Sequence, residues 1–179
     1  MPRIQPLPLE ETPDEVLKAY EKHRTQYQAG ITNMKSTLGH SLAAFEVYME
    51  WYRLYEQIKH ITGERMAYLF AYSISKGSNC PLCTTFFRKI IIDKGEKPEE
   101  LELSANEQLL LDFGNAIAGQ QGKIPDELFQ KISQLYTTSE LVDLVAFAGQ
   151  MIATNVFSNV IDTDIDEYLF SYLPFQNKK

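Results

Sequence analysis

The chain has 179 residues, of which 44% are hydrophobic and 23% charged, as expected for one globular domain with a sizeable core. Its formal net charge of −7 provides no basic surface, which argues against binding to nucleic acid or to an anionic membrane. The first fifteen residues contain prolines and acids instead of the apolar centre of a signal peptide, and we see no apolar run long enough to span a bilayer. We therefore expect a cytoplasmic protein, in which a cysteine pair is more often catalytic or metal-binding than a permanent disulfide.

Apolar residues recur at helical intervals along almost the whole chain, and no strand pattern interrupts them. Capping residues mark the expected helix starts at Ser41, Thr62, Ser78-Asn79, Ser104, Ser139 and Asp162. The sequence thus predicts an all-α, single-domain helical bundle over residues 1–179. We divide it into an N-terminal helical extension (1–40), a core (41–161), and a C-terminal helix and tail (162–179).

The motif CPLC places the chain's two cysteines, Cys80 and Cys83, at the start of a predicted helix. Residues three apart share one face of a helix, so the two thiols can close a disulfide. The positive potential at a helix N-terminus favours thiolate over thiol, and the thiolate is the species that attacks a peroxide or a disulfide. The short polar loop before Cys80 suits an exposed pair. The motif therefore predicts a redox-active dithiol.

The cysteines have other interpretations. They can be core residues, because free cysteines often fill core space as small apolar residues. A zinc site is disfavoured, because it needs about four ligands and the chain offers three histidines and no second C-x-x-C. A thioredoxin-like site needs a βαβ context that the pattern lacks. We expect no metal, flavin or haem.

A thiol that reacts with a peroxide needs groups that move protons. His60, Glu64, Tyr68 and Tyr72 lie four residues apart before the cysteines and can share one helix face, although His60 can fall just outside the helix. A buried Glu64 facing Cys83 would be a credible base, because burial raises the pKa of a carboxyl group. Each also has a structural reading, as a helix-end charge or as a core tyrosine.

The segment GERMAYLFAYSISKGSNCPLCTTFFRKIIIDKG resembles the central part of the carboxymuconolactone decarboxylase superfamily, in its alkylhydroperoxidase D-like branch. Residues 103–161 are similar to the second half of that family, and the resemblance covers residues 41–161. It implies an all-helical subunit that assembles as a homo-oligomer, a trimer or hexamer. It also implies that Cys83 attacks the peroxide and that Cys80 resolves the product, whereas the helix-dipole argument favours Cys80 as the thiolate.

The chain departs from the family pattern at two positions. The family histidine that follows the second cysteine by one turn is Phe87 here, and the family glutamate is Tyr68. A rebuilt relay would combine Glu64 and Tyr68 with a histidine from elsewhere, either His40 or His60.

By this resemblance we expect a thiol-dependent peroxidase or disulfide reductase in antioxidant defence. Its substrate would be a hydroperoxide, and its reductant a lipoyl- or thioredoxin-like dithiol. The alternatives are a non-enzymatic redox switch or assembly protein on the same fold and, less favoured, a lactone decarboxylase. The cysteine pair argues against the last, as does the scarcity of nearby arginines, which are Arg65 and Arg88.

Overall fold

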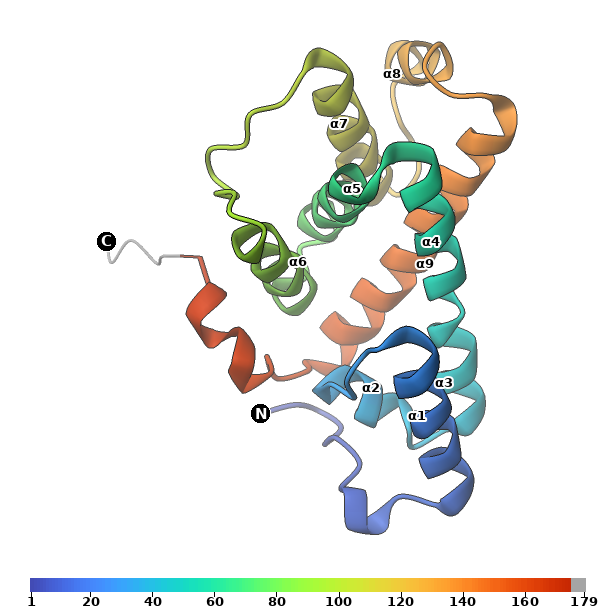
Figure 1. The fold of residues 1–179 in the computed structure, drawn as a ribbon, viewed down its shortest axis with the longest axis vertical. Coiled ribbons are helices and arrows are strands. Elements are labelled where there is room, and N and C mark those ends of the chain that lie inside the picture. Colours follow the sequence, from blue (N-terminus) through green and yellow to red (C-terminus); the bar gives the residue numbers. More distant parts are fainter. Residues whose placement is uncertain (175–179) are drawn as a thin grey trace.

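The computed structural model describes residues 1–174, and every regular element in that range is helical (Figure 1). The elements are η1 (Leu9–Glu11), α1 (Asp14–Tyr27), α2 (Asn33–Leu38), α3 (Leu42–Met49), α4 (Trp51–Thr62), α5 (Glu64–Gly77), α6 (Pro81–Asp93), α7 (Ala105–Gly119), α8 (Asp126–Ser133), α9 (Thr138–Ile161) and η2 (Glu167–Tyr172). The predicted all-α class is confirmed. The last part of the expected tail, residues 175–179, lies outside the described residues.

Helix α5 forms the centre of the molecule and packs against α4, α6, α7 and α9 (Figure 1). All residues from 66 to 75 are buried, so this helix has no solvent face over that stretch. Helix α7 approaches it closely at Gly114, where a Cβ atom would stand 2.5 Å from Ser73 Oγ and 2.7 Å from the ring of Phe70. Any larger residue at 114 would therefore push α7 away from the core.

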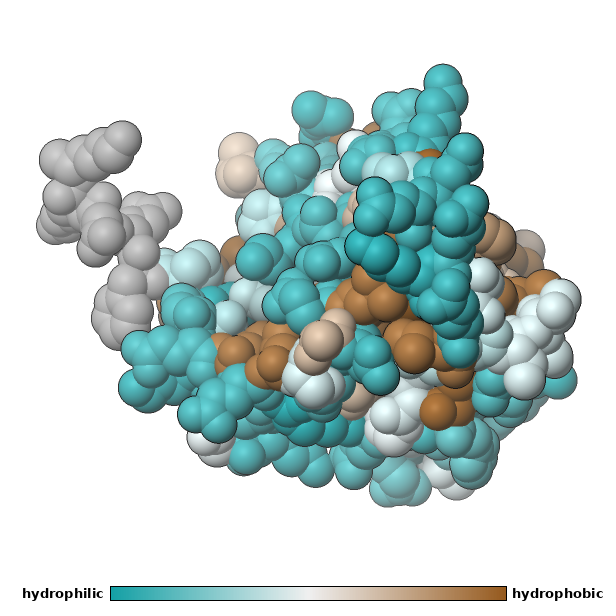
Figure 2. All heavy atoms as spheres, turned by 90° about the horizontal axis from the view of Figure 1, so that it is seen from above, coloured by the Kyte–Doolittle hydropathy of each residue, from teal (hydrophilic) through white to brown (hydrophobic). Residues whose placement is uncertain are grey.

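Helix α9 is the longest element, and by length and composition alone it could cross a membrane. This corrects the expectation that no apolar run is long enough. In the fold one face of α9 packs on α4 and α5, where Leu144, Phe147 and Ala148 are fully buried. Viewed from the end where α7 and α8 lie, the surface is mostly hydrophilic, with separate apolar patches (Figure 2).

Two of the predicted helix starts are confirmed. Ser41 Oγ accepts a hydrogen bond from the N–H of Ala44 at 3.3 Å, and Ser104 forms a reciprocal capping box with Glu107. The long segment after Ser41 divides into α3 and α4 at Glu50.

Other predicted starts are wrong by a few residues. Thr62 is the last residue of α4, because Gly63 adopts a φ of 82° and α5 begins after it. Thr137, rather than Ser139, caps α9. Asp162 adopts a left-handed conformation that ends α9, so it does not start a helix.

A second apolar cluster joins the two chain ends to the start of α6. It contains Val16, Tyr20, Met34, Leu38, Phe45, Met49, Cys80, Leu82, Cys83 and Leu169. Helices α1 to α3 lie at one end of α4 and α9, and the C-terminal segment passes beside α6 (Figure 1). The N-terminal extension and the C-terminal segment therefore both pack over the cysteine pair.

Candidate active site

Cys80 caps helix α6 with its own side chain. Its Sγ atom accepts a hydrogen bond from the backbone N–H of Cys83 at 3.4 Å, and Pro81 occupies the first helical turn. The sequence predicted this role for Ser78 or Asn79, one or two residues too early. A cysteine is an uncommon cap, because sulfur accepts hydrogen bonds weakly. The position sets the first thiol directly against the second.

The loop before the cysteines is fixed from helix α9. Asn159 Nδ2 donates to the carbonyl oxygens of Ser78 and Asn79, at 3.1 and 3.3 Å. Asn79 has a φ of 50°, a left-handed conformation that asparagine tolerates better than most residues. The hydrogen bonds from Asn159 thus hold the turn that delivers Cys80 to the helix start.

Both cysteines are free thiols and both are buried, with 1% of Cys80 and 7% of Cys83 exposed. The expectation of an exposed pair is therefore wrong. The reason is tertiary: apolar residues of α1 to α3, together with Leu169 of η2, belong to the same cluster as the two thiols. Any large reagent has to displace part of this cover to reach the sulfur atoms.

The two thiols differ in acidity. A hydrogen bond from Cys83 lowers the pKa of Cys80, and the amide groups of the helix start add to this effect. The same hydrogen bond, together with burial, raises the pKa of Cys83 well above its usual value. Cys80 is therefore the more acidic of the two thiols, and Cys83 is the donor in the hydrogen bond between them. Ser158 Oγ lies 4.0 Å from Cys83 Sγ on the side of α9.

A small apolar cavity of about 70 Å³ lies against Cys83. Cys83 is part of its wall and Cys80 is not. Phe87, which stands at the position of the family histidine, is also part of the wall and supplies only an apolar ring. The polar side chains that line it with Cys83 are Thr32, Lys35, Tyr52, Thr154 and Asp166.

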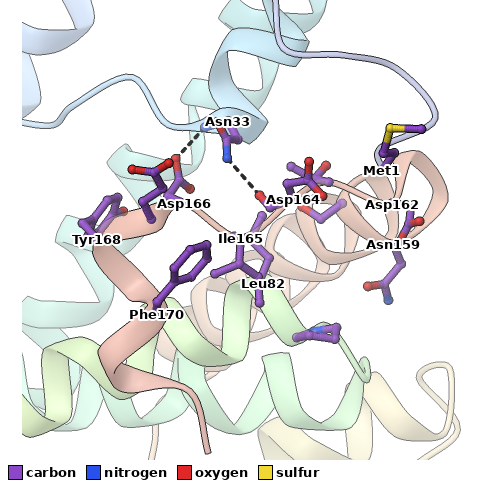
Figure 3. A pocket seen from close by; sticks show the side chains of 14 residues that line it. Met1, Asn33, Leu82, Asn159, Asp162, Asp164, Ile165, Asp166, Tyr168 and Phe170 are labelled. Atoms are coloured by element: carbon purple, nitrogen blue, oxygen red, sulfur yellow. Dashed lines mark hydrogen bonds between the residues drawn. The ribbon is translucent and has the colours of Figure 1, made fainter.

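An open groove of about 1130 Å³ lies next to this cavity (Figure 3). Leu82 and Asp166 line both spaces, so these two side chains stand between them. Asn33 holds the C-terminal segment at this point: its N–H donates to Asp166 Oδ1 at 2.8 Å and its Nδ2 donates to the carbonyl oxygen of Asp164 at 3.1 Å (Figure 3).

The structure does not bring Glu64 and Tyr68 to the cysteines. Glu64 is exposed and pairs with Lys94, whose Nζ lies 3.1 Å from its carboxylate. Tyr68 is buried, and its hydroxyl donates to Glu96 at 2.9 Å. Burial and this hydrogen bond raise the pKa of Tyr68 to about 12. Arg65 closes the same network through hydrogen bonds to Glu96, so Tyr68 belongs to a structural ion-pair network, and it does not line the cavity against Cys83.

The two candidate histidines both lie at the surface. His40 is exposed, and its Nε2 lies 3.0 Å from the carbonyl oxygen of Gln5. His60 is exposed in the last turn of α4. Neither lines the cavity against Cys83, so the expected relay of Glu64, Tyr68 and a histidine is not assembled within the described chain.

The titratable groups that do lie beside the cavity were missed by the sequence analysis. Lys35 of α2 is buried, with 6% exposed, and its Nζ lies 2.9 Å from Nε2 of the buried His23. A signal for His23 existed, since it follows Val16 by seven residues and Tyr20 by three and so shares their apolar helix face. No comparable signal marks Lys35, because its partners His23 and Tyr52 come from other helices, α1 and α4.

No protein-family model matches the chain, and no curated protein matches it in sequence. Solved structures do match it. A cysteine-to-alanine variant of the debrominase Bmp8, in complex with 2,3,4-tribromopyrrole, superposes with a TM-score of 0.76 over 94% of each chain at 16% identity. The alkylhydroperoxidase AhpD core of a peroxidase-related protein from Ralstonia eutropha JMP134 gives a TM-score of 0.69 at 15% identity, covering 96% of this chain and 98% of that one.

The chain has the alkylhydroperoxidase D-like fold. A third structure, a peroxidase-related protein from Silicibacter sp. TM1040, agrees with this, with a TM-score of 0.66 over 88% of each chain at 13% identity. The resemblance drawn from the sequence is thus confirmed at the level of the fold.

Proposed function

We propose that this alkylhydroperoxidase D-like protein is a thiol-dependent peroxidase, in which Cys83 attacks a small hydroperoxide and Cys80 resolves the product. The observation that carries the proposal is the pairing of one thiol that lines a small cavity with a second, more acidic thiol hydrogen-bonded to it. A dithiol of the lipoyl or thioredoxin type would reduce the resulting disulfide. The setting is antioxidant defence in the cytoplasm.

The asymmetry of the two thiols supports a defined order of steps. The proton of Cys83 passes to the thiolate of Cys80, and the Cys83 thiolate attacks the terminal oxygen of the hydroperoxide. The S–O bond forms as the O–O bond breaks, which leaves a sulfenic acid on Cys83 and releases an alkoxide or hydroxide ion, which takes up a proton to become an alcohol or water. The thiol of Cys80 then displaces water from this sulfenic acid and forms the disulfide. This order reconciles an acidic Cys80 with a reacting Cys83.

The size of the cavity restricts the substrate. At about 70 Å³ it is roughly half the volume of an engineered apolar cavity, about 150 Å³, that accepts benzene. Hydrogen peroxide and short alkyl hydroperoxides fit such a space, while an aromatic ring needs movement of Leu82 or Asp166 toward the groove. We therefore place small hydroperoxides first among the substrates.

The decisive experiment is titration of the reduced protein with hydrogen peroxide, followed by intact-mass spectrometry. We expect two thiols lost per chain and a mass lower by two hydrogens. Cys83→Ser should abolish peroxide consumption. Cys80→Ser, which lacks the thiolate that takes the Cys83 proton, should react more slowly and stop at the sulfenic acid. Unchanged consumption by Cys83→Ser would reject the role of Cys83.

A redox switch is the second candidate, and the burial of both cysteines favours it. A disulfide beneath the C-terminal segment is hard for an external dithiol to reach, which slows turnover. Sustained peroxide removal with excess dithiol would identify the enzyme. A single turnover followed by a changed oligomeric state would identify the switch.

Lactone decarboxylation gains no support from either arginine near the motif. A carboxylate substrate requires a free cation, but Arg65 is bound to Glu96 and Glu107. Arg88 is buried, and it pairs with Glu99 and donates to the carbonyl oxygen of Tyr172 at 2.9 Å. Both arginines therefore have structural partners.

A homo-oligomer, trimeric or hexameric, remains part of the proposal. Along α9, Val142, Val145, Val156 and Val160 are all exposed, and they share one helix face opposite the buried one. Gly149 lies in the same stripe with open space around it. An exposed apolar stripe of this length is suited to an interface between subunits.

A further inference from the structure

A buried ammonium group lies in the wall of the cavity, and the proposed steps do not use it. Lys35 Nζ donates to the carbonyl oxygen of Gly30 at 2.8 Å and to the hydroxyl of Tyr52 at 3.1 Å, and it lies 2.9 Å from His23 Nε2. These three partners account for all three N–H groups of an ammonium ion. A buried charge is costly unless it is paired, and buried charges gather at functional sites, so the position of Lys35 in the same cavity wall as Cys83 indicates a role in the chemistry of that thiol.

His23 is the neutral partner of this ammonium. Burial, followed by repulsion from Lys35, lowers the pKa of His23 to about 4. At neutral pH its Nε2 therefore accepts the hydrogen bond from Lys35, and Nδ1 carries the ring proton. Within residues 1–174 that Nδ1 atom has no partner. His23 thus holds Lys35 in place without supplying a proton of its own.

Tyr52 differs from Lys35 in having a hydrogen to give. Its oxygen accepts from Lys35, and among the described residues no acceptor is seen for its own O–H. Tyr52, Lys35 and Cys83 all line the same cavity, from α4, α2 and α6 respectively. A peroxide bound against Cys83 therefore shares this space with one uncommitted phenolic donor.

We propose that Tyr52 donates the proton to the oxygen that leaves when Cys83 attacks a hydroperoxide, and that Lys35 returns a proton to Tyr52. The inference rests on the proposed peroxidase function. In the step, the S–O bond forms, the O–O bond breaks, the departing oxygen takes the phenolic proton, and the phenolate takes one from the ammonium. Lys35 ends neutral, and the proton released when the external dithiol reduces the disulfide restores it. Tyr52 is then a catalytic residue and Lys35 a positioning residue.

The pH dependence follows from the groups that face Lys35. Burial lowers the pKa of Lys35 to about 8, with Asp166 acting in the opposite direction. Cys83 of α6 lines the same cavity, and its hydrogen bond to Cys80, together with burial, holds its pKa well above the usual value. The other titratable groups around Lys35 are His23 of α1, Tyr52 of α4, and Tyr168 beside Asp166 in the C-terminal segment. His23 titrates near pH 4, and burial raises the pKa of both tyrosines, so none of these three changes charge between pH 6 and 9. The oxidation rate should fall as pH rises through about 8.

The test compares two reagents on the reduced full-length protein in single-turnover experiments. Hydrogen peroxide loses hydroxide, which needs a proton, whereas iodomethane loses iodide, which needs none. Tyr52→Phe should slow oxidation by hydrogen peroxide about a hundredfold, while the rate at which iodomethane methylates the two cysteines should change less than threefold.

Lys35→Met should also slow oxidation by hydrogen peroxide, and it should remove the fall in the oxidation rate near pH 8. Matched controls on the same helix as Tyr52, Tyr55→Phe and Lys59→Met, should leave both rates unchanged.

The outcomes separate the two proposals. Suppose that the wild-type protein consumes hydrogen peroxide. If Tyr52→Phe then slows oxidation and methylation equally, or slows neither reaction, the role of Tyr52 is rejected while the peroxidase function stands. A fall near pH 8 that persists in Lys35→Met rejects the role of Lys35. If the wild-type thiols react with iodomethane and not with hydrogen peroxide, both proposals fail.

Discussion

The sulfur of Cys80 accepts a hydrogen bond from the backbone N–H of Cys83, so the first cysteine of the motif closes the end of the helix that carries the second. One atom therefore has a structural and a chemical role. As a cap it satisfies an otherwise unpaired amide, and in the proposed reaction it takes, as a thiolate, the proton of Cys83. Oxidation to a disulfide changes the charge and the hydrogen bond at this sulfur, so the redox state and the helix start are coupled.

Substitutions at Cys80 should separate these two roles. Serine retains an oxygen that can cap α6, whereas alanine has no acceptor. We expect the unfolding free energy of Cys80→Ala to be about 1 kcal/mol lower than that of Cys80→Ser in urea denaturation. Neither variant should form the disulfide. Equal stabilities of the two variants would show that the cap contributes nothing.

Leu169 of η2 should control access to the thiols, because it is buried in the same cluster and lines the cavity. Leu169→Ala should raise the rate at which a bulky aromatic disulfide reagent labels the cysteines by at least about tenfold. It should also lower the unfolding free energy by about 2 to 4 kcal/mol. The neighbouring Phe170 is exposed, and Phe170→Ala is the matched control that should change neither quantity. Identical labelling of both variants would mean that access is controlled elsewhere.

Glu64 and Tyr68 should be dispensable for thiol chemistry. Glu64→Gln removes a surface ion pair, and oxidation by hydrogen peroxide should stay within twofold of wild type. Tyr68→Phe removes the hydrogen bond to Glu96 and should lower the unfolding free energy by about 1 kcal/mol, again without slowing oxidation. A tenfold slower oxidation in either variant would restore that residue to the site.

His23 should make the protein less stable in mild acid. Its pKa is about 4 in the folded chain and near 6.5 when unfolded, so between these values only the unfolded chain takes up the proton. The unfolding free energy therefore falls as pH drops below 6.5, with a loss of about 2 kcal/mol between pH 7 and pH 5. In His23→Gln this loss should disappear, while the exposed His60→Gln should keep it. Urea unfolding at both pH values measures the difference.

The valine stripe of α9 should decide the oligomeric state. Val145→Glu and Val156→Glu place charges in the exposed apolar face and should shift the protein toward monomer in light scattering coupled to size-exclusion chromatography. Glu140→Gln, at the exposed start of the same helix, is the control for a change of charge outside the stripe. Unchanged mass in both valine variants would remove α9 from the interface.

Much of the fold could be predicted because helix periodicity and capping are local. Ser104 with Glu107 marks a helix start that the structure retains. The predicted starts failed where a neighbouring residue competed, as Gly63 did with Thr62 and Thr137 with Ser139. Stacking of Glu64 under Tyr68 on one helix did not create a relay, because the two side chains found ion-pair partners on other elements, Lys94 and Glu96.

The sequence by itself determined the helical class and the placement of two cysteines at a helix start, since both depend on residues within one or two turns of each other. Only the tertiary structure decided that the thiols are covered, which of them faces a cavity, and that Lys35, His23 and Tyr52 meet beside it. Those contacts join α1, α2, α4 and α6 with the C-terminal segment. Burial and proximity across such separations arise from packing, which no local pattern along the chain records.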